Sequence, residues 1–137
     1  MIINAEKLVL GRVATVAAKK ALLGEEVKIV NCEKAVIIGN RRSIIQDYLA
    51  KLELGQPQQG PFMQRRPDLF VKRAVRGMLP RRKASGRAAQ GRIMCYMGIP
   101  AEFAGKETVL KGAYTSKTKK DCMTVGELCM HMGDNKR

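Results

Sequence analysis

Ten cationic side chains lie within the 29 residues from Gln64 to Arg92, where Asp68 is the only acid. Eight of the ten are arginines, whose guanidinium groups grip phosphate oxygens in bidentate fashion and also stack on bases. Such a single-sign segment repels itself unless phosphates neutralise it. The chemistry that this pattern predicts is phosphate binding, through Arg65, Arg66, Lys72, Arg73, Arg76, Arg81, Arg82, Lys83, Arg87 and Arg92.

The charge of the whole chain points the same way, because 26 Lys and Arg against 12 Asp and Glu give a formal charge of +14. A polyanion is the expected partner, and nucleic acid is favoured over an acidic membrane because no long amphipathic helix carries these cations. Aromatic residues make up only 4% of the chain, so we expect binding to the shape and backbone of RNA rather than base stacking. Second-tier contact candidates are Arg41, Arg42, Lys117, Lys119 and Lys120.

Residues that could support catalysis or bind a metal are sparse. Gly11 lies where nucleotide folds place a phosphate loop, but neither GxGxxG nor the Walker pattern is present. His131 is the only histidine, and its neighbour Cys129 has no CxxC partner for a zinc site. Cys32 and Cys95 lie in apolar stretches, where thiols are usually inert. We expect reduced thiols, no catalytic residue, no metal, no cofactor and no small-molecule substrate; saturable ATP or NAD binding would instead indicate a nucleotide-binding enzyme.

The elements that must position the basic residues follow from apolar periodicity. Residues 27–32, 35–38 and 92–98 are short and largely apolar, which is typical of strands buried on both faces of a parallel sheet covered by helices. A helix is predicted from Gly11 onward, ending near Gly24. Its apolar positions are Val13, Ala14, Ala17, Ala18, Ala21 and Leu22.

Three more helices are predicted around the basic segment, besides a short helical piece over residues 84–89. Asn40 can cap a helix that Gly55 ends, and Asp68 can cap one that runs to about Met78, before Pro80. At 100° per residue, the second of these places its cations opposite its apolar side chains. Near the end of the chain, residues 124–127 have capping-box spacing.

The length of 137 residues, with 45% hydrophobic residues, predicts one domain over residues 1–137, with a basic loop-helix segment at 56–92. The start lacks a signal-peptide pattern, and no apolar run approaches the ~18 residues of a membrane span. We therefore expect a soluble, intracellular protein.

Several runs resemble the L-thirteen family of large-subunit ribosomal proteins over essentially the whole chain. Residues 74–80 read AVRGMLP, which matches the most specific signature of that family, and residues 92–100 read RIMCYMGIP. The start, with LGRVAT at 10–15, and the stretch VNCEKAVIIGNR at 30–41 resemble further family motifs, although Asn4 stands where Asp is usual. The second stretch and the lack of a histidine-rich end favour an archaeal-type member.

The resemblance implies a three-layer α/β/α fold around a four-stranded parallel sheet of order 3-2-1-4. It also implies a cytoplasmic structural constituent of the large ribosomal subunit that binds ribosomal RNA, meets neighbouring proteins and joins early in assembly. Docking can then require a partly folded ribonucleoprotein. Gly77 and Gly86 are expected to allow close backbone approach to RNA, although Gly77 can equally be a mere helix-weakening position.

An RNA-binding regulator that acts off the ribosome is the main alternative. Sedimentation of cell lysate discriminates, because a ribosomal protein travels stoichiometrically with large subunits.

Overall fold

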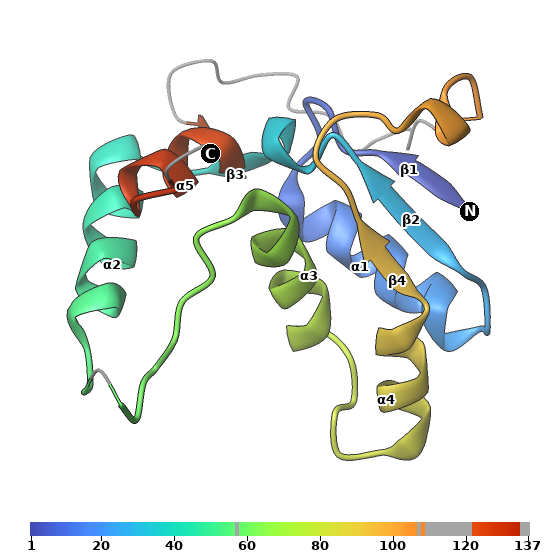
Figure 1. The fold of residues 1–137 in the computed structure, drawn as a ribbon, viewed down its shortest axis with the longest axis horizontal. Coiled ribbons are helices and arrows are strands. Elements are labelled where there is room, and N and C mark those ends of the chain that lie inside the picture. Colours follow the sequence, from blue (N-terminus) through green and yellow to red (C-terminus); the bar gives the residue numbers. More distant parts are fainter. Residues whose placement is uncertain (57, 107, 109–121, 135–137) are drawn as a thin grey trace.

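Three parallel strands form the main sheet of the computed structural model, which describes residues 1–56, 58–106, 108 and 122–134 (Figure 1). The strands are β1 (Ile2–Asn4), β2 (Val27–Val30) and β4 (Ile93–Cys95), in the order β1-β2-β4. Ile3 is paired with Ile29, and Ile29 with Cys95. A parallel sheet is therefore present, and it contains strands from two of the three predicted apolar runs, 27–32 and 92–98.

Helix α1 (Leu10–Leu22) connects β1 to β2 and lies behind the sheet in Figure 1. The predicted periodicity is confirmed, because Val13 and the four alanines of α1 at 14, 17, 18 and 21 are buried. Leu22, at the end of the predicted stripe, is 44% exposed. Small alanine side chains let α1 approach the neighbouring elements closely, and burial of this apolar face stabilises the helix.

The strands are buried unevenly, so the expectation of strands buried on both faces is only partly met. Ile29 and Ile93 are fully buried, whereas Met94 is 46% exposed. On the outer face, the Lys28 ammonium lies 4.7 Å from the ring centre of Phe103, in the short 3₁₀ helix η2 (Ala101–Phe103). The sheet therefore has one apolar face, against α1, and one mixed face.

The sheet order 3-2-1-4 is not confirmed, because β3 (Val36–Ile38) pairs antiparallel with β5 (Cys122–Thr124) in a separate two-stranded sheet. Asn31 adopts a left-handed conformation with φ 56°, and the 3₁₀ helix η1 (Cys32–Lys34) follows it. The Asn31 side chain donates to Oδ1 of Asn4 over 3.0 Å, which holds this bend against β1. The bend leads β3 away from β2, and the fold is mixed α/β.

Helices α2 (Arg41–Glu53) and α5 (Val125–His131) begin as the sequence predicts. Oδ1 of Asn40 accepts a hydrogen bond from the backbone N–H of Arg42, and Oγ1 of Thr124 accepts one from that of Glu127. Each bond satisfies an N–H group that the helix start leaves unpaired. Both predicted caps are confirmed.

Helices α3 (Pro67–Gly77) and α4 (Ala84–Gly91) form the basic part of the molecule. Helix α3 packs against α1, β4 and η1, so it is the central element. Its N-cap is Arg66 and Pro67 occupies the first turn, so Asp68 lies inside the helix rather than at the predicted cap position. Proline suits this place because the first helical N–H groups have no partner within the helix. In the part of the chain that the structure describes, no helix is long and apolar enough to cross a membrane.

Candidate nucleic-acid interface

Helix α3 separates its apolar from its cationic side chains. Phe70, Val71 and Val75 are buried in the core, and the helix packs against α1 on that side. The other side presents half-exposed cations, which confirms the one-sided basic helix that the 100° periodicity predicts. These cations are Lys72, Arg73 and Arg76.

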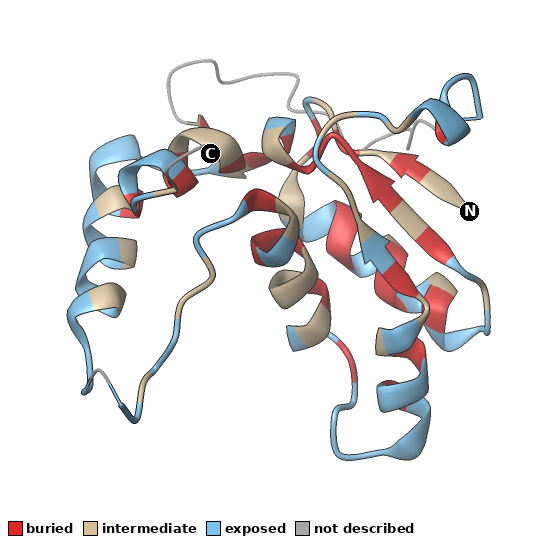
Figure 2. Cartoon of the chain, viewed as in Figure 1, coloured by how far each residue is buried: buried red, intermediate tan, exposed pale blue. Residues whose placement is uncertain are grey.

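The turn between α3 and α4 presents a second group of cations, and we call residues 67–91 the basic hairpin. Pro80 follows α3, and its carbonyl oxygen accepts a hydrogen bond from the backbone N–H of Lys83 over 3.0 Å. The side chains of Arg81, Arg82 and Lys83 are exposed at this end of the molecule, as Figure 2 shows for the whole turn. This hydrogen bond closes the turn, and the charged side chains of the turn remain exposed to solvent.

The two glycines of the basic hairpin have different surroundings. Gly86 is buried, and a Cβ added to it would lie 2.2 Å from the Pro80 carbonyl oxygen. The close approach that residue 86 allows is therefore to Pro80 within the protein, not to RNA as expected. Gly77 has open space around it and ends α3, so both interpretations of that residue remain predictions.

A groove of about 130 Å³ lies along the cationic side of α3. One apolar side chain, three cations and two side-chain amides line this groove. The cations and the amides donate hydrogen bonds, and this suits an anion. The charge pattern of the sequence does not indicate these two amides, because glutamine carries no charge. The lining residues are Gln64, Leu69, Lys72, Arg73, Arg76 and Gln90.

Three of the predicted contact arginines have partners inside the protein. Arg92 donates to the carbonyl oxygen of Ala21 over 3.3 Å, at the C-terminal end of α1, where helix carbonyls lack partners. Arg73 donates to the carbonyl oxygen of Phe62 and so fastens the preceding loop to α3. Arg66 forms an ion pair of 3.0 Å with Asp68. These arginines contribute to the framework, whatever else they contact.

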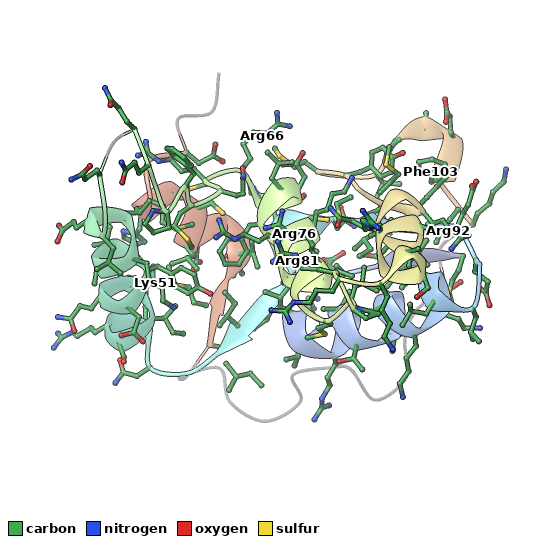
Figure 3. The ribbon with its side chains drawn as sticks, turned by 90° about the horizontal axis from the view of Figure 1, so that it is seen from below. Lys51, Arg66, Arg76, Arg81, Arg92 and Phe103 are labelled. Atoms are coloured by element: carbon green, nitrogen blue, oxygen red, sulfur yellow. The ribbon has the colours of Figure 1, made fainter. Side chains whose placement is uncertain are left out.

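Five residues of the basic hairpin have a cationic side-chain group with no hydrogen-bond or ion-pair partner in the described part of the chain. In the view from below, Arg76 and Arg81 lie over the centre of the face, and Arg92 lies beyond α4 (Figure 3). An unpaired, exposed cation keeps all of its donors for an external anion. These five are Arg76, Arg81, Arg82, Lys83 and Arg87.

The other predicted contacts are spread over the molecule. Arg65 is exposed just before α3, near Gly133 at the end of α5. Arg41 and Arg42 begin α2, whose Tyr48 ring lies 5.4 Å from the ring of Phe70 in α3. Arg41 forms an exposed ion pair of 3.7 Å with Glu127. The remaining second-tier candidates lie outside the described residues: Lys117, Lys119 and Lys120.

The thiols are in environments that disfavour the reactive thiolate. The hydrogen bond between Cys32 and Cys95, followed by burial, raises the pKa of the Cys32 thiol. Burial raises the pKa of Cys129 to about 12, with a smaller contribution from the charge of Asp134. Both groups are protonated near neutral pH. Among the described residues, no cluster of three or more His, Cys, Asp or Glu side chains could hold a metal ion.

Comparisons with known proteins find similar chains among ribosomal proteins. The family model described as "Ribosomal protein L13" matches residues 1–102. The chain is 41% identical over 134 residues to "Large ribosomal subunit protein uL13" of Methanococcoides burtonii, covering 96% of each chain. It is 45% identical to the protein of that name from Methanosarcina barkeri, over 79% of this chain and 78% of the relative. It is 37% identical to the protein of that name from Haloarcula marismortui, over 99% of this chain and 92% of the relative.

Proposed function

Because the chain belongs to the ribosomal protein L13 family, we propose that it is a structural constituent of the large ribosomal subunit that binds ribosomal RNA through the basic hairpin. The observation that carries this proposal is the group of five cations without a partner among the described residues, set on one helical hairpin. Proteins of this family are structural components of the ribosome, and the chain is not an enzyme.

In the proposed complex, the turn after α3 contacts the RNA backbone first. Arg81, Arg82 and Lys83 are adjacent and exposed, so they can reach successive phosphates along one strand. The close packing of Gly86 on Pro80 limits how far this turn can move, which lowers the entropy lost on binding. Such contacts set position and affinity without reading bases directly.

The groove along α3 supplies a place for one more phosphate. Lys72, Arg73 and Arg76 provide positive charge, and the amides of Gln64 and Gln90 can donate further hydrogen bonds. Arg73 uses only part of its guanidinium for Phe62, because this group carries five N–H donors. The same holds for Arg66 and Arg92, which we propose as weaker contacts, with Arg65 and the second-tier cations at the periphery.

We also propose that the chain acts as a single domain in the cytoplasm, meets neighbouring ribosomal proteins and joins the large subunit early in assembly. The early role is supported by the family membership alone. It is tested by measuring how much of the protein is present in precursor particles isolated during subunit assembly. A protein that is absent from all precursors and present only in finished subunits contradicts this part of the proposal.

The double variant Arg81→Glu/Arg82→Glu tests the RNA-binding assignment. We expect less of this variant in large subunits after sucrose-gradient sedimentation, because carboxylates would repel the phosphates. The matched control Lys19→Glu/Lys51→Glu makes the same change in net charge as the test variant, but at positions on α1 and α2. We expect this control to be incorporated. Full incorporation of the Arg81/Arg82 variant would contradict the assignment. Wild-type protein that sediments apart from the ribosome would instead indicate a free RNA-binding regulator.

A further inference from the structure

An acidic and apolar groove lies at the end of the molecule opposite the turn of the basic hairpin. It has a volume of about 370 Å³, within the range of roughly 300–1,000 Å³ typical of small binding pockets. Its walls come from η1, the start of α3, the loop after β4, and α5, which gather at the top of Figure 1. The residues that matter here are Glu33, Pro67, Met97, Glu127, Met130 and Asp134.

Hydrogen bonds to backbone groups hold the three residues that supply the carboxylates of this groove. Both carboxylate oxygens of Glu33 lie within 3.2 Å of the backbone N–H of Gly98, which donates to them and orients the group. Glu127 is in the first turn of α5, next to the cap made by Thr124, and the backbone N–H of Asp134 donates to the carbonyl of Cys129 over 2.9 Å. Each carboxylate keeps free lone pairs, because two oxygens together accept about four hydrogen bonds.

Only one described cation pairs with these carboxylates. Arg41 reaches Glu127 at 3.7 Å, with side chains that are 56% and 44% exposed. Exposed pairs of this kind contribute little to stability, so a cation from a partner can replace Arg41 at small cost. Arg65 lies nearby, beside Gly133, and is not among the lining residues. Among the described residues, the lining holds three acids and no base, in a chain with a formal charge of +14.

The apolar part of the groove is exposed to solvent. Met97 is 45% exposed and Met130 is 54% exposed, while Pro67 borders them from the start of α3. Methionine side chains adapt their shape to a partner and are frequent at protein-binding surfaces. Apolar side chains flanked by carboxylates match a partner that carries apolar and cationic side chains together.

Helix α3 runs from this groove to the turn of the basic hairpin and keeps the acidic and cationic side chains apart. Pro67 begins α3 at the groove, and Gly77 ends it before the cationic turn. The helix dipole places partial positive charge at the start and partial negative charge at the end, which stabilises acids at the groove and cations at the turn. Carboxylates repel phosphates, so RNA bound at the turn is directed away from the groove.

We propose that this groove binds an extended segment of another protein in which Lys or Arg alternates with apolar side chains. The cations of that segment contact Glu33, Glu127 and Asp134, and its apolar side chains cover Met97 and Met130. The proposal goes beyond RNA binding and does not depend on it, because no cation of the basic hairpin's turn lines the groove.

The test uses the full chain and a fluorescein-labelled peptide of about twelve residues in which Lys alternates with Leu, with binding followed by fluorescence anisotropy. We expect Glu127→Lys/Asp134→Lys to weaken binding about tenfold, and Met130→Ser about threefold, because they remove charge and apolar contacts. The control Glu26→Lys/Glu53→Lys makes the same charge change at exposed positions outside the lining and should retain most of the affinity. Thermal melting followed by circular dichroism confirms that each variant is folded.

Variant peptides test which side chains of the bound segment the groove recognises. Peptides with Ser in place of Leu, or Glu in place of Lys, should bind at least about tenfold more weakly. Equal binding by these peptides, or equal loss in the control and groove variants, overturns the proposal. It is also overturned if the groove variants lower the affinity for ribosomal RNA, or if sedimentation shows a dimer of this chain that the groove variants dissociate.

Discussion

Gly86 lies directly against the backbone of Pro80, where a Cβ on residue 86 would stand 2.2 Å from the carbonyl oxygen and 2.6 Å from the carbonyl carbon. Backbone atoms cannot move aside as a flexible side chain does, so this contact requires glycine. The contact joins the first turn of α4 to Pro80, in the segment between α3 and α4. It therefore sets the shape of the turn that carries Arg81, Arg82 and Lys83.

Replacing Gly86 with alanine should destabilise the protein. The added methyl group must push the Pro80 backbone away, and overpacking of this kind costs about 1–3 kcal/mol in the free energy of unfolding. Urea denaturation measures the loss. Gly77→Ala is the matched control, because open space surrounds Gly77 and alanine favours the helix, so stability should stay equal or rise by up to ~1 kcal/mol. Equal stability of the two variants would refute the packing role of Gly86.

Replacing Arg92 with methionine should lower stability more than the same change at Arg87. Arg92 donates to the Ala21 carbonyl at the end of α1, and loss of that hydrogen bond costs about 0.5–1.5 kcal/mol. Arg87 is exposed and unpaired among the described residues, so its replacement should leave the melting temperature nearly unchanged. Differential scanning calorimetry compares the two. A larger drop for Arg87→Met would show that the Arg92 contact does not support α1.

Removing two charges from the turn should flatten the salt dependence of RNA binding. Each phosphate contact contributes a slope of about 0.7–0.9 in the logarithm of affinity against the logarithm of salt. Arg81→Gln/Arg82→Gln should therefore reduce the slope by about 1.4–1.8 for large-subunit RNA in a reconstitution mixture. Lys19→Gln/Lys51→Gln, outside the basic hairpin, serves as the control. An unchanged slope for the Arg81/Arg82 variant would mean that the turn does not touch phosphate.

Stability should fall at alkaline pH because of Cys129. Burial raises the pKa of this thiol from its ordinary value of 9.0 to about 12 in the folded chain. The unfolded chain loses the proton first, so the contribution is fully present below pH 9 and is lost as the pH rises toward about 12. Denaturation measured from pH 8 to 11 should show a steeper decline for the wild type than for Cys129→Ala. Parallel declines would indicate that Cys129 does not cause the effect.

Local features of the fold could be predicted from the sequence. The caps at Asn40 and Thr124, the end of α3 before Pro80, and the two faces of α3 all depend on residues within a few positions of one another. Capping, proline geometry and helical periodicity act over that range, so sequence alone is sufficient. The same is true of the charge of the basic segment, which is a property of composition.

Contacts between distant residues could not be predicted in this way. The choice of β5 as the partner of β3, the bond from Arg92 to Ala21, and the packing of Gly86 on Pro80 depend on the path of the chain in space. The bend at Asn31 leads β3 out of the parallel sheet, and periodicity gives no sign of it because it concerns one backbone conformation.

The sequence by itself therefore determined the family resemblance, the helices and a cationic segment suited to phosphate. Only the tertiary structure decided which of those cations have internal partners, and that Glu33 and Asp134, about a hundred positions apart, share one groove. The physical reason is that composition and spacing describe neighbours along the chain, whereas pairing and grooves arise when packing brings distant segments together.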